Sequence, residues 1–133
     1  MASIPAVPGV YAYLLESNDA PAFLERSPAG WFKGRDPTIT VDVLYGRWIP
    51  GCPVLYLGQT SNLRRRLRQR ARFAAGHRSG AWGGRALWQL KDAQDLVIAW
   101  RPVTDGQTAK EIESSLLDAF RLQWQRLPFA NLS

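Results

Sequence analysis

The sequence predicts one α/β domain, a small sheet with helices around it. Three short apolar runs rich in valine, leucine and tyrosine predict strands, and segments with helical periodicity lie between and after them. Helices that interleave with a few strands are typical of a sheet covered by helices. The chain has 133 residues, of which 46% are hydrophobic, so it is long enough for one core and no second domain is expected.

The predicted strands are short and are bounded by turn residues. They are expected at Pro8–Glu16, Val54–Gly58 and Leu96–Val103. The third run is apolar on both faces, so we expect it to be buried rather than to lie at the surface. The order of the strands in the sheet does not follow from these patterns.

Helical patterns occupy three segments, Ser61–Ala75, Gly84–Leu90 and Thr108–Arg126. The long interval from Ser17 to Pro50 contains several prolines and glycines and is expected to be irregular. Within it we expect a short helix near Ala20–Arg26 and a strand within Ile39–Ile49.

Charge and composition narrow the class of partner. The net charge is +6, which favours an anionic partner, nucleic acid ahead of a membrane surface. Cys52 and His77 are the only cysteine and the only histidine, so a disulfide framework and a zinc site are not expected. Metal chemistry would therefore depend on carboxylates and a hard cation such as Mg²⁺. The sequence shows no signal peptide and no apolar run near twenty residues, and a cytoplasmic protein is expected.

The arginines of the Ser61–Ala75 helix fall into two groups. Leu63, Leu67, Ala71 and Ala74 are predicted to form one apolar stripe. Four arginines point away from it and form either a solvated face or a phosphate-binding face: Arg64, Arg65, Arg68 and Arg72. Two more, Arg66 and Arg70, lie beside the stripe, where a partly desolvated guanidinium needs an anionic partner.

The last helix contains one acidic residue without an evident structural role. Glu113 lies about 100° from Ile112, inside the apolar arc of the helix. A carboxylate there is costly unless it is paired or binds a cation, so a structural ion pair with an arginine and a metal site are the two alternatives. Glu111, by contrast, fits a capping box that begins at Thr108.

Five motifs, in this order, resemble those of the GIY-YIG nuclease family. The sequences "GVY" at Gly9–Tyr11 and "YLG" at Tyr56–Gly58 are similar to the two motifs in the family name. In "QTSNLRRRL" the family arginine corresponds to Arg66, and in "AKEIESSLL" the family glutamate corresponds to Glu113. "PFAN" is similar to the closing motif, with its asparagine at Asn131. Each motif alone is weak evidence, but the ordered set is specific, and it agrees with the helix-face analysis.

The resemblance implies an α+β fold with a mostly antiparallel three-stranded sheet. It implies a metal-dependent endonuclease that hydrolyses phosphodiester bonds in DNA, RNA not being excluded, with one Mg²⁺ or Mn²⁺ ion held by Glu113. Arg66 would donate to the phosphate. Tyr11 would act as general base with a metal-bound water or orient the nucleophile, Tyr56 would position the phosphate or the nucleophile, and Asn131 would brace the site.

Two departures from the family pattern stand out. Arg70 occupies the position where the family often has a histidine or tyrosine, and His77 in the following loop is a candidate substitute. The same loop contains a basic and aromatic mixture suited to backbone contact and base stacking, unless its tryptophans complete the core. The predicted nucleic-acid-binding residues are Arg64, Arg65, Arg68, Arg70, Arg72, Arg78 and Arg85.

The second departure is an insertion at about residues 17–50 between the first two motif strands, which the family usually joins by a short hairpin. We consider two alternatives to a nuclease. The first is a non-catalytic nucleic-acid-binding module with the same fold. The second is an interaction domain that contacts a protein partner through the insertion.

Overall fold

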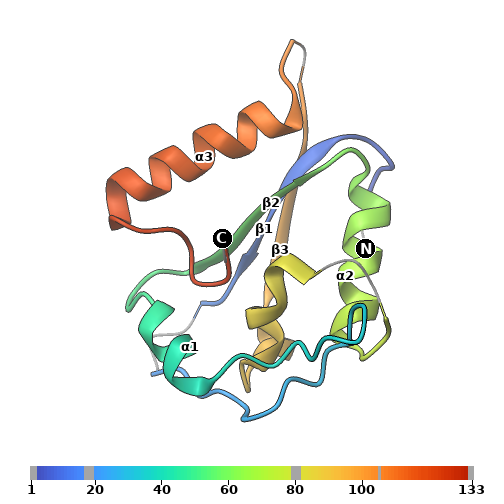
Figure 1. Cartoon of the computed structure of the whole chain (residues 1–133). Helices are drawn as coiled ribbons and strands as arrows, with labels where there is room; N and C mark the ends of the chain where they lie inside the picture. Colours follow the sequence, from blue (N-terminus) through green and yellow to red (C-terminus); the bar gives the residue numbers. More distant parts are fainter. Residues whose placement is uncertain (1–2, 17–19, 79–81, 105, 132–133) are drawn as a thin grey trace.

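The computed structural model describes residues 3–16, 20–78, 82–104 and 106–131, which form an antiparallel three-stranded sheet with helices on both faces (Figure 1). The strands are β1 (Gly9–Leu14), β2 (Val54–Thr60) and β3 (Val97–Pro102), in the order β2-β1-β3. The α-helices are α1 (Val41–Arg47), α2 (Leu63–Ala74) and α3 (Ala109–Trp124), and two 3₁₀ segments are η1 (Trp82–Gln89) and η2 (Ala93–Asp95). The predicted α+β class and the three strands are confirmed.

The side chains of the central strand β1 show which face of the sheet is covered by the main core. Its Tyr11 lies opposite Gly58 of β2, and its Tyr13 lies opposite Tyr56. These tyrosines belong to the main core, together with Leu63 and other buried residues of α2 and η1. Because side chains alternate along a strand, the neighbouring positions of β2 face the other way.

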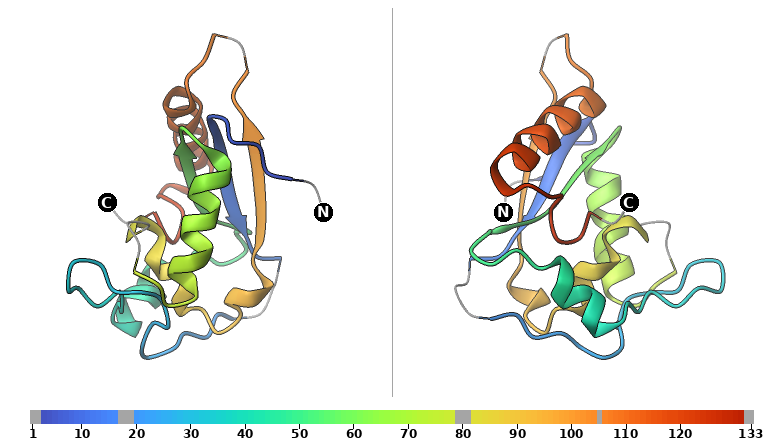
Figure 2. Two further views of the ribbon diagram at one scale, coloured as in Figure 1. Left: turned by 90° about the vertical axis from the view of Figure 1, so that its right-hand side faces the viewer. Right: turned by 60° about the vertical axis from the view of Figure 1, so that its left-hand side comes forward.

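The second face of the sheet is covered by α3. Phe120 and Trp124 of that helix pack with Leu57 and Val54 of β2 in a separate, smaller core. Thr108 caps the start of the helix by accepting a hydrogen bond from the Glu111 backbone, as the capping pattern predicted. Figure 2 shows α2 and α3 on opposite sides of the sheet.

The prediction that the third strand is buried was wrong. β3 pairs only with β1 and forms an edge of the sheet, where Val97 and Ile98 are exposed. An apolar run indicates strand propensity but not position, and with only three strands in the sheet one terminal strand has no element over its outer residues.

The prediction of two regular elements in the insertion was also wrong. Residues 41–47 form helix α1 rather than a strand, because Val41, Leu44 and Trp48 share one helix face and pack on the core. No helix forms over the described residues of Ala20–Arg26. Instead Phe23 forms a β-bridge with Leu90.

A buried amide helps to attach the insertion to the rest of the domain. Gln89, at the end of η1, is completely buried. Its side chain accepts from the Ile39 N–H at 2.8 Å and donates to the carbonyls of Ile39 at 2.7 Å and Leu24 at 2.9 Å. These bonds satisfy the buried amide and fix two segments of the insertion against η1.

No helix in the described residues is both long enough and apolar enough to cross a membrane.

Gly9, the first residue of the "GVY" motif, has a steric role in this fold. A Cβ atom there would lie 2.5 Å from the Arg101 carbonyl oxygen and from a methyl group of Leu63. Gly9→Ala should therefore destabilise the protein by about 1–3 kcal/mol because it overpacks the contact between β1, β3 and α2. Chemical denaturation measures this loss.

The matched control for this prediction is Gly46→Ala. Gly46 lies inside α1, and a Cβ atom there meets no other atom within 4 Å. Alanine is the better helix former, so this variant should gain about 0.5–1 kcal/mol. A Gly9→Ala variant as stable as the wild type would contradict the packing argument.

Candidate functional site

Two tyrosines from adjacent strands meet one buried arginine. Arg70 of α2 donates from Nε to the Tyr11 hydroxyl at 2.7 Å and from Nη2 to the Tyr56 hydroxyl at 2.6 Å. Its guanidinium also lies 4.4 Å from the Tyr56 ring centroid and 5.3 Å from that of Tyr11. We call these three residues the Tyr–Arg cluster. The structure thus joins the tyrosines of the two strand motifs through the residue that departs from the family pattern.

The cluster is buried, and its electrostatics follow from that burial. Arg70 and Tyr11 are each 3% exposed and Tyr56 is 9% exposed. Burial raises the pKa of Tyr11 to about 12 although the charge of Arg70 opposes the shift, so this phenol is protonated at neutral pH. Burial would lower the pKa of Arg70, but the neighbouring phenol oxygens outweigh it and raise that pKa.

The Tyr–Arg cluster contains hydrogen-bond donors that have no acceptor in the described residues. The Nη1 group of Arg70 is buried and, within the described part of the chain, has no hydrogen-bond partner. Both phenol oxygens accept from Arg70, and neither phenol donates its proton to an acceptor in the described residues. No carboxylate is among the groups that shift the pKa of Arg70. A buried cation surrounded by unused donors is suited to an anion.

The position of Arg70 corrects the predicted apolar stripe of α2. The buried residues of the helix are Leu63, Leu67, Arg70 and Phe73, whereas Ala71 is exposed. Arg70 follows Leu63 by seven residues, or about two helical turns, so it lies on the same face. This spacing already indicated that Arg70 lies on the buried face of the helix. The prediction placed Arg70 beside the stripe, at the edge of the core, and a helix pattern cannot show the phenols that accept its hydrogen bonds because they lie far away in the sequence.

Arg66, the predicted phosphate-binding arginine, is half-buried and lines an open polar pocket. Its Nη1 donates to Gln69 at 3.4 Å, and its charge is one of the influences on the pKa of Tyr11. The pocket, of about 620 Å³, is lined by Gln59, Thr60, Ser61, Arg65, Arg66 and Gln69. It contains two arginines and no carboxylate, at the end of β2 where α2 begins.

Glu113, the predicted metal ligand, is half-buried on α3. Burial raises the pKa of this carboxyl, and the charge of Lys110 offsets the shift only in part. No hydrogen bond or ion pair joins Glu113 to Arg66 or to the tyrosines among the described residues, so the structural ion pair considered above is absent there. Figure 1 shows α3 starting at the end of the sheet where β2 leads into α2.

Asn131 has the geometry of a brace. Its Oδ1 accepts from the Leu57 N–H at 3.0 Å, and its Nδ2 donates to the Leu57 carbonyl at 2.9 Å. The adjacent Ala130 N–H donates to the Leu55 carbonyl at 2.8 Å. The chain end thus pairs with the free edge of β2 on both sides of Tyr56, and this pairing fixes the strand segment that holds the second tyrosine.

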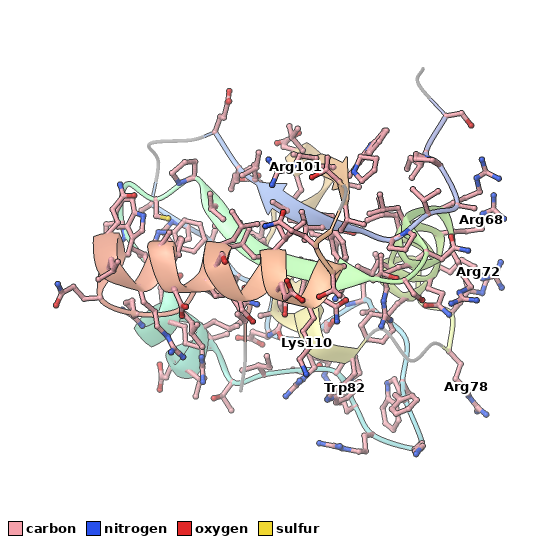
Figure 3. All side chains as sticks on the ribbon, turned by 90° about the horizontal axis from the view of Figure 1, so that it is seen from above. Arg68, Arg72, Arg78, Trp82, Arg101 and Lys110 are labelled. Atoms are coloured by element: carbon pink, nitrogen blue, oxygen red, sulfur yellow. The ribbon has the colours of Figure 1, made fainter. Side chains whose placement is uncertain are left out.

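The four outward arginines of α2 and Arg78 lie at the surface, whereas Arg85 of η1 is half-buried. Arg65, Arg68 and Arg72 are exposed on α2, and exposed Arg64 donates from Nε to the Ile4 carbonyl at 2.8 Å. Figure 3 shows Arg68, Arg72 and Arg78 directed away from the body of the protein.

His77 follows α2 and is exposed, and its imidazole takes part in no hydrogen bond among the described residues. Arg70, not His77, lies at the tyrosines. Trp88 is buried in the main core, and Trp82 packs against that core. Both tryptophans thus contribute to the core, as the alternative interpretation of that loop expected.

The described residues contain no group of three or more His, Cys, Asp or Glu side chains that could hold a metal ion. Comparisons with protein-family models, curated proteins and solved structures gave no match to this chain. The resemblance to GIY-YIG nucleases therefore depends on the motif residues and on their arrangement in this fold.

Tyr11→Phe tests the buried cluster. The substitution leaves Arg70 Nε without its acceptor in the core, so the free energy of unfolding should fall by about 1–3 kcal/mol at pH 7. The wild type should lose stability as the pH rises above 10 toward 12, because the unfolded state releases the phenol proton first, and this loss should be smaller in the variant.

Urea denaturation at pH 7 and at pH 10–11 measures both effects. Tyr45→Phe is the control, because Tyr45 is half exposed and its hydroxyl is 3.5 Å from its nearest acceptor. Equal losses in the two variants would show that the phenol oxygen of Tyr11 does not stabilise Arg70.

Proposed function

We propose that this chain is a metal-dependent endonuclease of the GIY-YIG type, which hydrolyses phosphodiester bonds in DNA. The observation that carries the proposal is the Tyr–Arg cluster. Tyr11 and Tyr56, which the resemblance selected, converge on one cation in a site with unused donors. A phosphate oxygen is the acceptor that such a site lacks.

The polar pocket beside the cluster supports a phosphate-binding role. Arg66 and Arg65 line it, and a guanidinium can donate two parallel hydrogen bonds to a phosphate. Arg66 acts on the pKa of Tyr11, so the pocket and the cluster belong to one electrostatic environment. In this proposal Arg66 binds the phosphate and Arg70 holds the phenol oxygens in position.

The protonation of Tyr11 limits its chemical role. A phenol with a pKa of about 12 is almost wholly protonated at neutral pH, which favours the orienting role over that of a general base. The hydroxyl groups of Tyr11 and Tyr56 can each donate to a phosphate oxygen or to the attacking water while they accept from Arg70. The two phenols would thus orient the reactants through hydrogen bonds.

Glu113 fits a site for a single Mg²⁺ or Mn²⁺ ion. Mg²⁺ commonly binds one or two carboxylates and completes its shell with waters and substrate phosphates, so a cluster of carboxylates is not required. Glu113 is a half-buried carboxylate whose pKa is raised by burial, and a bound cation would remove that penalty. When bound, the ion would polarise the phosphoryl oxygen and stabilise the leaving alkoxide.

A non-catalytic nucleic-acid-binding module is the second candidate. The observation that favours it is the depth of the Tyr–Arg cluster, because Tyr11 and Arg70 are each only 3% exposed. In that case the basic face of α2 would bind DNA and the cluster would be structural. Incubation of the pure protein with labelled DNA of varied structure, with and without Mg²⁺ or Mn²⁺, separates the two candidates, since only a nuclease yields metal-dependent cleavage.

Glu113→Gln provides the sharper test. The substitution preserves shape and removes the charge that would hold the metal, so cleavage should fall by orders of magnitude while DNA binding persists. Because burial makes the ionised carboxylate unfavourable in the folded state, the variant should be at least as stable as the wild type at pH 7. Cleavage assays and denaturation curves give the two measurements.

Glu111→Gln is the control on the same helix. Its backbone N–H still donates to Thr108, so the variant loses only the favourable charge at the helix N-terminus, about 0.3–1 kcal/mol. Equal losses of cleavage in the two glutamine variants at matched stability would defeat the assignment of Glu113.

The outward arginines of α2 should contribute affinity that depends on salt and not on sequence. Replacement of Arg68 and Arg72 by glutamine removes two cations that can release counterions from phosphates, so the slope of log affinity against log salt should become shallower by about 2. DNA-binding titrations at several salt concentrations measure the slope.

The control here is Arg121→Gln, a change at an exposed position of α3. An Arg68/Arg72 variant with the wild-type slope would assign these arginines to a solvated helix face.

A further inference from the structure

A second basic and aromatic cluster lies on the surface, outside the motif residues. Its centre is Trp82 of η1. The guanidinium groups of Arg35 and Arg85 lie 5.0 Å and 4.6 Å from the Trp82 ring centroid. The Phe32 ring lies 6.2 Å from the same ring, and the Lys33 ammonium group lies 5.2 Å from the Phe32 centroid. We call these five residues the Trp82 patch.

The insertion supplies three of the five residues through a tight hairpin. Phe32 and Arg35 exchange backbone hydrogen bonds of 3.1 Å and 2.9 Å. The two residues between them have positive φ, 52° at Lys33 and 75° at Gly34, as in a type I′ turn. Paired residues of a hairpin project to the same side, so this turn presents Phe32 and Arg35 together. Figure 2 shows the segment projecting from the body of the protein.

The charged groups that act on Arg85 of the patch, within the described residues, are other arginines. Burial lowers the pKa of Arg85, and the like charges of Arg35 and Arg47 lower it further. No carboxylate is among the influences on that pKa. Three arginines that gather in this way repel one another unless an anion lies between them. Trp31, at the base of the same hairpin, is 54% exposed.

The patch adjoins the Tyr–Arg cluster through η1. A Cβ atom on Gly84 would lie 2.5 Å from Arg70 Nη1, and one on Gly83 would lie 3.6 Å from the Tyr56 hydroxyl. Trp82 and Arg85 flank these two glycines in the chain. A ligand that covers the patch therefore lies next to the Tyr–Arg cluster.

We propose that the Trp82 patch binds a single-stranded DNA segment, so that the substrate of the proposed nuclease contains unpaired bases beside the cleaved bond. An unpaired base can stack on the aromatic and guanidinium planes of the patch, and Arg35, Arg47 and Arg85 can meet the phosphates. Base faces inside a duplex are already stacked and cannot make this contact. The inference rests on the proposed function for its link to cleavage but not for binding itself.

The test uses the full chain with Glu113→Gln, so that binding is measured without cleavage. The probes are a fluorescent 12-nucleotide oligothymidine and a blunt duplex with the same number of nucleotides per strand, and anisotropy reports the affinity. We expect the single strand to bind at least tenfold more tightly than the duplex. Phe32→Ala, which removes an aromatic ring of the patch, should weaken binding of the single strand by roughly fivefold or more and binding of the duplex by less than twofold.

Arg35→Gln and Arg121→Gln form a matched pair that removes one exposed arginine inside or outside the patch. Only the first should reduce the preference for the single strand. Phe32 belongs to neither core cluster and Arg35 is exposed, so neither variant endangers the fold as a change of Trp82 would. Equal affinity for the two probes, or equal losses for both probes in the patch variants, would overturn the inference.

Competition and cleavage complete the test. Polyglutamate that displaces the oligothymidine as effectively as unlabelled oligothymidine would show general anion binding and would also overturn the inference. Wild-type cleavage of duplex but not of single-stranded or partly unpaired DNA would contradict it while the proposed nuclease function stands. Binding that prefers the single strand, without cleavage under any metal condition, would confirm the patch and reject the nuclease.

Discussion

A buried guanidinium with no carboxylate partner in the described part of the chain is the constraint on which this site depends. Arg70 instead donates hydrogen bonds to the phenol oxygens of Tyr11 and Tyr56. This arrangement requires that the two tyrosines lie on adjacent strands and face the same side of the sheet. The surrounding residues must then be small. A Cβ atom on Gly58 would lie 2.6 Å from the Tyr11 ring, and one on Gly84 would meet Arg70. The glycine of the "YLG" motif is thus explained by the space that the tyrosine of the "GVY" motif occupies.

The attachment of the insertion concerns the backbone polar groups of a long irregular segment. A long irregular segment carries many backbone groups that need partners, and a surface loop of this length would ordinarily leave them to water. Here the buried amide of Gln89 bonds to Ile39 and Leu24, while α1 places Leu44 in the core. The hairpin that carries Phe32 and Arg35 is therefore part of a segment fixed to η1, and η1 also covers the Tyr–Arg cluster.

The distribution of charge connects the pocket, the exposed face of α2 and the Trp82 patch. The net charge of +6 is not spread evenly, since arginines line the pocket at the end of β2, cover the exposed face of α2 and surround Trp82. Burial makes the ionised form of Glu113 unfavourable, and this residue lies on α3, which starts at the end of the sheet where β2 leads into α2. Uncompensated positive charge with one uncompensated carboxylate is the pattern expected where an anionic substrate and a cation meet, and it underlies the proposal of a nuclease.

The sequence by itself determined the fold class, the three strands, the helices that became α2 and α3, and the cap at Thr108, because each depends on periodicity or on contacts within a few residues. It also selected Tyr11 and Tyr56 as partners through the order of motifs. Only the tertiary structure decided that Arg70 rather than Ala71 is buried, that residues 41–47 form a helix, and that β3 is an edge strand. Each of these outcomes depends on segments distant in the chain. The guanidinium needs the phenols, one face of α1 needs the core, and β3 is an edge strand because no further strand of the described residues pairs with it. Local patterns carry no information about such partners, so the chemistry of the cluster emerges only when the chain has folded.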